Sequence, residues 1–116
     1  MSIEYLKNYN NDDLEVPRGY ISEPILTLTN MPVDDISADA FAFDIGVSGD
    51  TAIVSGACSI ISAVGIQKIK FTIPANAFTK AQKKLVLQIR WTISGGSEKI
   101  IVRRFIDVIN PVTPTP

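Results

Sequence analysis

The sequence predicts an all-β domain, built as an antiparallel sandwich or barrel. Several short segments alternate apolar and polar residues with a period of two, and glycine, proline and aspartate residues separate them at regular intervals. The chain has 116 residues, of which 46% are hydrophobic and 20% charged, so it is long enough for one core. We therefore predict a single domain over residues 20–109.

Both ends of the chain differ from this domain in composition. Residues 1–19 are polar, contain an Asn–Asp cluster and end near Pro17 and Gly19, which predicts an extended N-terminal arm. They lack the apolar run of a secretory signal, and no segment approaches the ~20 apolar residues of a membrane span. Residues 110–116, "NPVTPTP", predict a proline-rich extended tail.

The first strands are bounded by breakers. Residues 25–28 alternate leucines and threonines between two prolines and predict a short strand. Residues 41–47 place phenylalanine, isoleucine and valine at every second position, which is typical of a half-buried strand. Residues 51–65 predict two short strands around Ser55-Gly56 and a turn at Val64-Gly65.

The next segments predict a strand and then a change of structure. Ile69, Phe71 and Ile73 fall on one face of an alternating strand. Residues 74–83 break this pattern with Pro74, which suits a first helical position, and with alanines, glutamine and lysines. We predict a short helical crossing there.

Residues 84–109 predict the closing β-hairpin. A two-residue loop at Gly95-Gly96 suits hairpin twist, whereas a four-residue loop would place Arg90 opposite Arg103 and destabilise the pair. The tighter loop sets five main pairs: Trp91 with Ile100, Ile89 with Val102, Gln88 with Arg103, Val86 with Phe105, and Lys84 with Asp107.

This register separates the hairpin into two faces. One face is the predicted core, with Arg104 as its exception. The other face is more apolar than a solvent-facing sheet usually is, and arginines border its apolar stripe. Such a composition is typical of a protein–protein interface, although a loop or the arm of the same chain would cover the stripe equally well. The predicted interface residues are Val86, Arg90, Ile101, Arg103 and Phe105.

Most catalytic constellations are missing from the sequence, and nothing in it suggests the remaining one, a pair of carboxylates at a defined separation in a cleft. The sequence contains no histidine, which excludes Ser-His-Asp and Cys-His sites, and its one cysteine, Cys58, is predicted to be a small buried hydrophobe. The acidic pairs in residues 10–13 and 34–35 lack calcium-loop spacing. A net charge of −1 argues against nucleic-acid binding. We therefore expect no catalytic, metal-binding or cofactor-binding residues, no cofactor, and no enzyme activity.

Two phrases carry a resemblance to a known family. "FTIP" at residues 71–74 leads into the predicted crossing, and "LVLQIRW" at residues 85–91 follows it. Residues 20–109 resemble small Ig-like β-sandwich domains of tailed-bacteriophage virions, among them the N-terminal-type domain of baseplate upper proteins. In its length the chain is more similar to a capsid decoration, or cement, protein.

The resemblance implies a single antiparallel Ig-like β-sandwich and a non-enzymatic structural role in the virion, after synthesis in the host cytoplasm. The implied partners are the major capsid protein or other virion proteins, with a homo-oligomer, preferably a trimer, and neither nucleic acid nor membrane. Two alternatives stay open: a tail or baseplate adaptor domain, and a cell-surface or carbohydrate-binding sandwich module.

Overall fold

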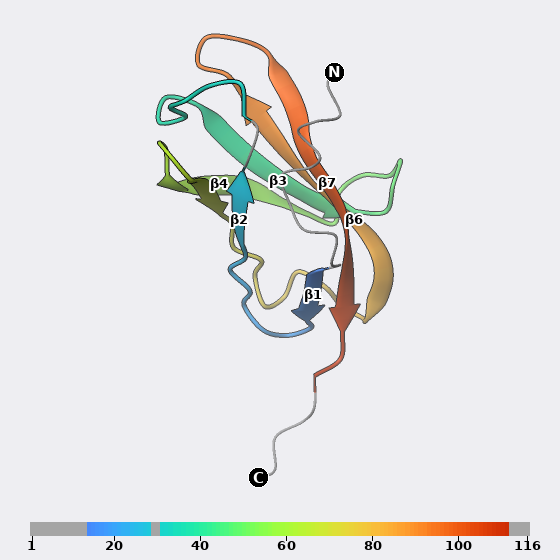
Figure 1. Ribbon diagram of the computed structural model, residues 1–116. Coiled ribbons are helices and arrows are strands. Elements are labelled where there is room, and N and C mark those ends of the chain that lie inside the picture. Colours follow the sequence, from blue (N-terminus) through green and yellow to red (C-terminus); the bar gives the residue numbers. More distant parts are fainter. Residues whose placement is uncertain (1–13, 29–30, 112–116) are drawn as a thin grey trace.

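The computed structural model describes residues 14–28 and 31–111, and within these ranges the chain is all-β (Figure 1). The strands are β1 (Leu14–Pro17), β2 (Ile25–Leu28), β3 (Ala40–Gly46), β4 (Val54–Ser62), β5 (Gln67–Lys70), β6 (Gln82–Thr92) and β7 (Glu98–Ile109). They form one sheet in the order β1-β7-β6-β3-β4-β5-β2. The predicted all-β class is thus confirmed.

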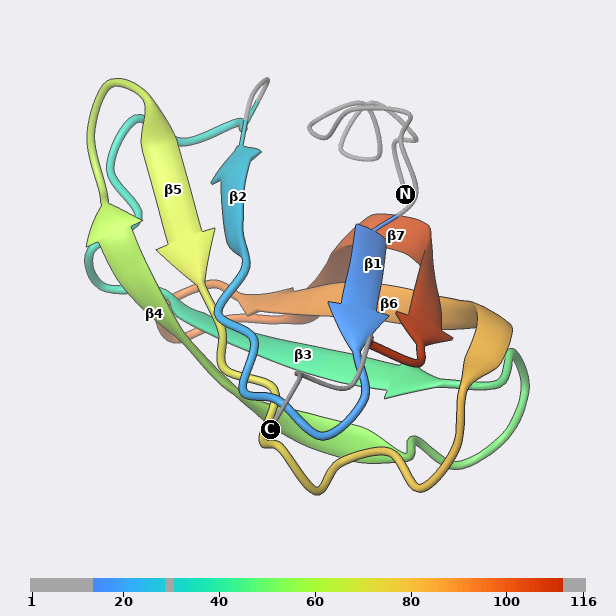
Figure 2. The same ribbon diagram turned by 90° about the horizontal axis from the view of Figure 1, so that it is seen from below.

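The long strand β4 makes this sheet continuous. Its first half pairs with β3, and its second half pairs with β5. Figure 2 shows the result as a trough, in which β3 and β4 lie along the floor, β5 and β2 rise on one side, and β1 and β7 on the other. The two short strands predicted around Ser55-Gly56 are therefore a single strand.

The pairing of β1 corrects two predictions. Leu14–Pro17 runs parallel to β7, so the sheet is mixed and not purely antiparallel. A parallel edge strand is possible here because no tight hairpin joins β1 to its partner. The predicted arm, residues 1–19, contributes this strand to the sheet, and its residues 1–13 lie outside the described residues. The same holds for residues 112–116 of the predicted tail.

The core fills the inside of the trough. Every second residue of β3 and β6 points inward, as the alternation predicts, and Trp91 is fully buried at the centre. The Trp91 indole Nε1 donates a 2.9 Å hydrogen bond to Asp39 Oδ2, which satisfies its polar atom. The rings of Phe43 and Phe71 pack with centroids 4.6 Å apart and join the floor of the trough to its β5 side.

The predicted helical crossing at residues 74–83 is wrong. A turn closed by a 3.1 Å bond from Ala77 N–H to the Pro74 carbonyl begins this segment, and no helix follows within it. Phe78 is buried against the core, and Gln82 already belongs to β6. Tertiary burial and strand pairing therefore outweigh the helix propensity of the alanines and lysines.

The hairpin of β6 and β7 keeps the predicted register only in its middle. Leu85 to Ile89 pair with Val102 to Ile106 as predicted, including Val86 with Phe105 and Gln88 with Arg103. The loop is one residue longer than predicted, because Ile93 N–H bonds to the Ser97 carbonyl. An extra residue in β7, Ile101, compensates for this difference as a β-bulge.

The bulge exchanges the faces of two isoleucines. Ile101 and Val102 both point into the core and are fully buried, whereas Ile100 pairs with Arg90 and is 38% exposed. The predicted pair of Trp91 with Ile100 is wrong, since Trp91 lies opposite Lys99. A second irregularity lies between Gln82 and Leu85.

At this second irregularity Lys84 has a φ of 62° and donates its backbone N–H to Asp107 Oδ1 at 2.9 Å. The predicted cross-strand pair of Lys84 with Asp107 is thus replaced by a bond from the lysine's backbone. Arg104 lies opposite Leu87, as predicted, and is half-buried. No helix long and apolar enough to cross a membrane occurs in the part of the chain that the structure describes.

Candidate functional site

The outer face of β3, β6 and β7 holds four of the five predicted interface residues. Val86 and Arg90 lie on β6 and are half-buried, and Arg103 and Phe105 lie on β7 and are exposed. Ile101, the fifth, is buried in the core because the bulge turns it inward. Ile100 lies on the outer face in its place, although the predicted register assigned Ile100 to the core.

A carboxylate that the sequence did not single out organises this face. Asp44 of β3 accepts hydrogen bonds from Arg90 Nε at 2.7 Å and Gln88 Nε2 at 2.8 Å on Oδ2. Its Oδ1 accepts from Ser55 Oγ at 2.7 Å and from Arg90 Nη2 at 3.2 Å. Arg90 Nη1 also donates to Glu98 Oε2 at 3.3 Å. The network thus joins β4, β3, β6 and β7 across the sheet.

The network affects two titratable groups. Burial acts to raise the pKa of Asp44, but hydrogen bonds from Gln88, Ser55 and Arg90, together with the Arg90 charge, outweigh it and lower that pKa. Burial raises the pKa of the Cys58 thiol to about 12, and the charge of Asp44 adds to the rise against an opposing effect of Arg90. Cys58 is half-buried beside the core, close to its predicted environment, and its thiol is protonated at neutral pH.

Phe105 is the main apolar group of the face. Its side chain is 46% exposed although it stands on a central part of β7, and Val86 lies directly opposite on β6. The ammonium of Lys84 lies 4.9 Å from the centroid of the Phe105 ring, a cation–π arrangement. A large part of the apolar ring surface remains exposed beside this contact.

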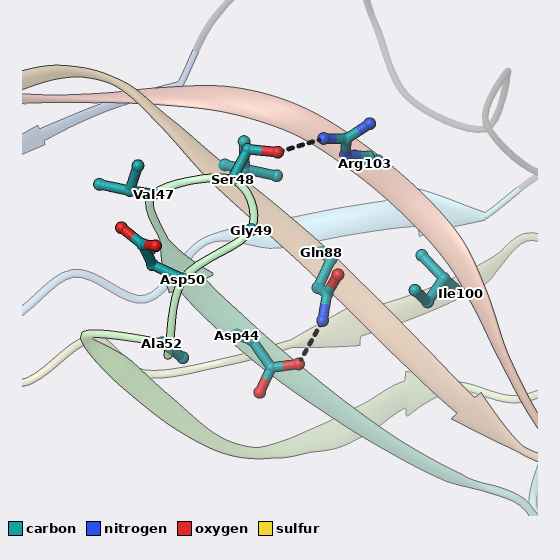
Figure 3. Close-up of a pocket in the computed structure, with 11 residues that line it drawn as sticks. Asp44, Val47, Ser48, Gly49, Asp50, Ala52, Gln88, Ile100 and Arg103 are labelled. Atoms are coloured by element: carbon teal, nitrogen blue, oxygen red, sulfur yellow. Dashed lines mark hydrogen bonds between the residues drawn. The ribbon is translucent and has the colours of Figure 1, made fainter.

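A depression of about 610 Å³ adjoins this apolar group between the sheet and the loop of residues 47–52 (Figure 3). The loop begins with a turn closed by a 3.0 Å bond from Asp50 N–H to the Val47 carbonyl, and Gly49 supplies the φ of 87° that the turn requires. Arg103 Nη2 donates to Ser48 Oγ at 3.0 Å, which joins the loop to β7. Asp44, Val86, Gln88 and Ile100 also line the depression.

These side chains bind each other. Both oxygens of Asp44 accept hydrogen bonds, Oδ2 from Arg90 and Gln88, and Oδ1 from Ser55 and Arg90. Among the described residues, no group of three or more His, Cys, Asp or Glu side chains lies where it could hold a metal ion. The arrangement is a stiff, partly apolar surface with charged groups at fixed positions.

Sequence reasoning missed Asp44, Ser48 and Ile100 for different reasons. The alternation of β3 places Asp44 on the outer face. Its partners lie on β6, and the pairing of β3 with β6 cannot be predicted from the residues around Asp44. The contact of Ser48 with Arg103 depends on the path of the loop that carries Ser48. The outward position of Ile100 depends on the bulge in β7.

A scan against models of protein families finds no match to this chain, and a search of curated proteins finds none either.

Proposed function

We propose that this chain is a non-enzymatic structural protein of a tailed-bacteriophage particle, a capsid decoration or cement protein that binds neighbouring subunits through the outer face of β3, β6 and β7. One observation carries the proposal. Phe105 is 46% exposed on β7, opposite Val86, with the ammonium of Lys84 over its ring and Arg103 held by Ser48 on the same strand face. An aromatic residue among arginines at a fixed position is the composition of an interface hot spot.

The order of the strands supports the finer expectation of an Ig-like sandwich. In Ig domains the sixth strand pairs with both the third and the seventh in one sheet, and the second strand pairs with the fifth in the other sheet. Here β7, β6 and β3 are neighbours, and β2 pairs with β5. We propose that the trough is such a sandwich, with β4 running continuously from one layer to the other.

The fixed side chains of the outer face favour docking over catalysis. Asp44, Arg90 and Gln88 lose little conformational freedom on binding, because hydrogen bonds already restrict them. A partner therefore meets a surface that is organised before contact. The role in the particle also implies a homo-oligomer, with a trimer preferred, and contacts to the major capsid protein.

The test is binding to purified phage shells that lack this protein. The wild-type chain should bind them, and Phe105→Ala should weaken the apparent Kd by about tenfold or more. Ile21→Ala is the matched control, because Ile21 is an exposed aliphatic residue outside the outer face. Circular dichroism would establish that both variants are folded.

Other outcomes decide between the alternatives. Binding to tail or baseplate preparations in place of shells would favour the adaptor domain, and specific binding to a glycan array would favour the carbohydrate module. A wild-type chain that binds no particle component, and that is a monomer by light scattering, would overturn the proposal.

A further inference from the structure

A second recess lies at one end of the trough, where the turn between β4 and β5 meets the segment that follows β2. It encloses about 500 Å³, and its walls are mainly aliphatic. Figure 2 shows β5 between β4 and β2, so that this turn and the end of β2 lie at the same end of the sheet. We call this recess the tip groove. Leu28, Met31, Val33, Asp34, Val64 and Ile66 are among the residues that line it.

Hydrogen bonds hold the two sides of the tip groove together. Gln67 is a buried polar residue, and its Nε2 donates 3.1 Å bonds to the carbonyls of Val33 and Ala63, one on each side. Ile36 N–H also donates to the Ala63 carbonyl at 3.2 Å, and Asp35 forms a β-bridge with Val64. The groove therefore exists before any partner binds, which lowers the entropic cost of binding.

The rim of the tip groove exposes more apolar surface than the turn requires. Val64 and Ile66 are 61% and 67% exposed, which exceeds the exposure of Phe105 on the outer face. Between them Gly65 has a φ of 75° and allows the turn to form. A turn of this kind would accept polar residues on either side of the glycine, so folding does not explain the aliphatic pair.

The charge of the groove indicates what it would accept. Asp34 is the one charged residue among the described residues that line it. The neighbouring Asp35 carboxylate accepts a 2.9 Å bond from Ser37 N–H and lies outside the lining. An aliphatic recess with a single carboxylate is complementary to an apolar side chain that has a lysine or arginine beside it.

We propose that the tip groove is a second docking site, which takes an apolar side chain of a neighbouring virion protein while a basic residue next to that side chain pairs with Asp34. This proposal rests on the proposed function and adds to it a second surface, distinct from the outer face. A protein with two such surfaces can join two neighbouring subunits, as a stabiliser of an assembled shell must.

The test uses the full chain and shells that lack it. Ile66→Ser should weaken the apparent Kd by about 30-fold, because it removes an exposed anchor. Asp34→Lys should weaken it by about tenfold or more, and Asp34→Asn by less, with a smaller dependence on salt than the wild type. Ile25→Ser is the matched control, since Ile25 is 56% exposed on β2 and does not line the groove.

The outcomes separate this proposal from the function on which it rests. Shell binding that falls for Phe105→Ala but is unchanged for Ile66→Ser and Asp34→Lys would overturn the tip groove and leave the function standing. Light scattering without shells gives a further outcome. If the wild type self-associates and Ile66→Ser abolishes this, the occupant of the tip groove is a second copy of the chain, and the tip-groove proposal is overturned. Absence of wild-type binding to shells would overturn both proposals.

Discussion

Replacing Gly56 by alanine should destabilise the fold through one contact. An added Cβ at Gly56 would lie 2.9 Å from Cε1 and 3.4 Å from Cζ of Phe43, its cross-strand partner. Phe43 is 2% exposed and packs on Phe71, so the ring has little room to move away. Overpacking of this kind costs about 1–3 kcal/mol. The φ of Gly56 is not positive, so Gly56→Ala also gains about 0.4–1 kcal/mol from the unfolded state.

From the middle of both ranges, the net expectation is a loss of about 1.3 kcal/mol in the free energy of unfolding. Urea denaturation followed by the fluorescence of the buried Trp91 would measure it. Gly96→Ala is the matched control, because its Cβ would meet no atom closer than 3.5 Å and its φ is not positive either. This control should change stability by no more than about 0.5 kcal/mol.

A double-mutant cycle isolates the contact itself. In a Phe43→Leu background the ring edge is gone, so Gly56→Ala should cost clearly less than in the wild type. An equal cost in both backgrounds, or a Gly56→Ala protein as stable as the wild type, would refute the reasoning.

Two further predictions concern the bulge and the outer-face network. Ile101→Ala should cost about 2–5 kcal/mol in chemical denaturation and Ile100→Ala less than about 1 kcal/mol, and the reverse order would contradict the bulge. Asp44→Asn should lower stability by about 1–3 kcal/mol at neutral pH, because Arg90 loses a charged partner. The folded-state pKa of Asp44 is lowered from 3.8, so its contribution is present above that value and is lost as the pH falls through the folded pKa. The stability difference between wild type and Asp44→Asn should therefore shrink below pH 3.8, and a pH-independent difference would contradict this assignment.

Several elements of the fold could be predicted because their signal is local. The alternation in residues 41–45 and 85–91 placed Phe43, Ile89 and Trp91 in the core, where the structure has them. The same alternation put Val86 and Arg90 on the outer face, and the predicted pairing with Val86 put Phe105 there too. Side chains of a strand alternate strictly between its faces, so a regular strand reveals its buried side without knowledge of its partners.

The failed predictions share a non-local cause. The segment of residues 74–83 has helix-forming residues, but burial of Phe78 and the pairing of Gln82 in β6 determine its structure. The hairpin loop was predicted from charge repulsion between two arginines, a contribution of less than about 1 kcal/mol. The bulge buries Ile101 in place of Ile100, and it depends on how β6 and β7 pair along their whole length, which no local pattern reveals.

The all-β class, the positions of most strands and the inward face of β6 could be derived from the amino-acid sequence, since each follows from a period of two along the chain. Three other features emerge from packing: β4 joins both parts of the sheet, Ile101 points inward in place of Ile100, and Asp44 binds Arg90, Gln88 and Ser55. Each of these depends on contacts between residues far apart in sequence, whose energies are small individually and are settled only when the strands pack together.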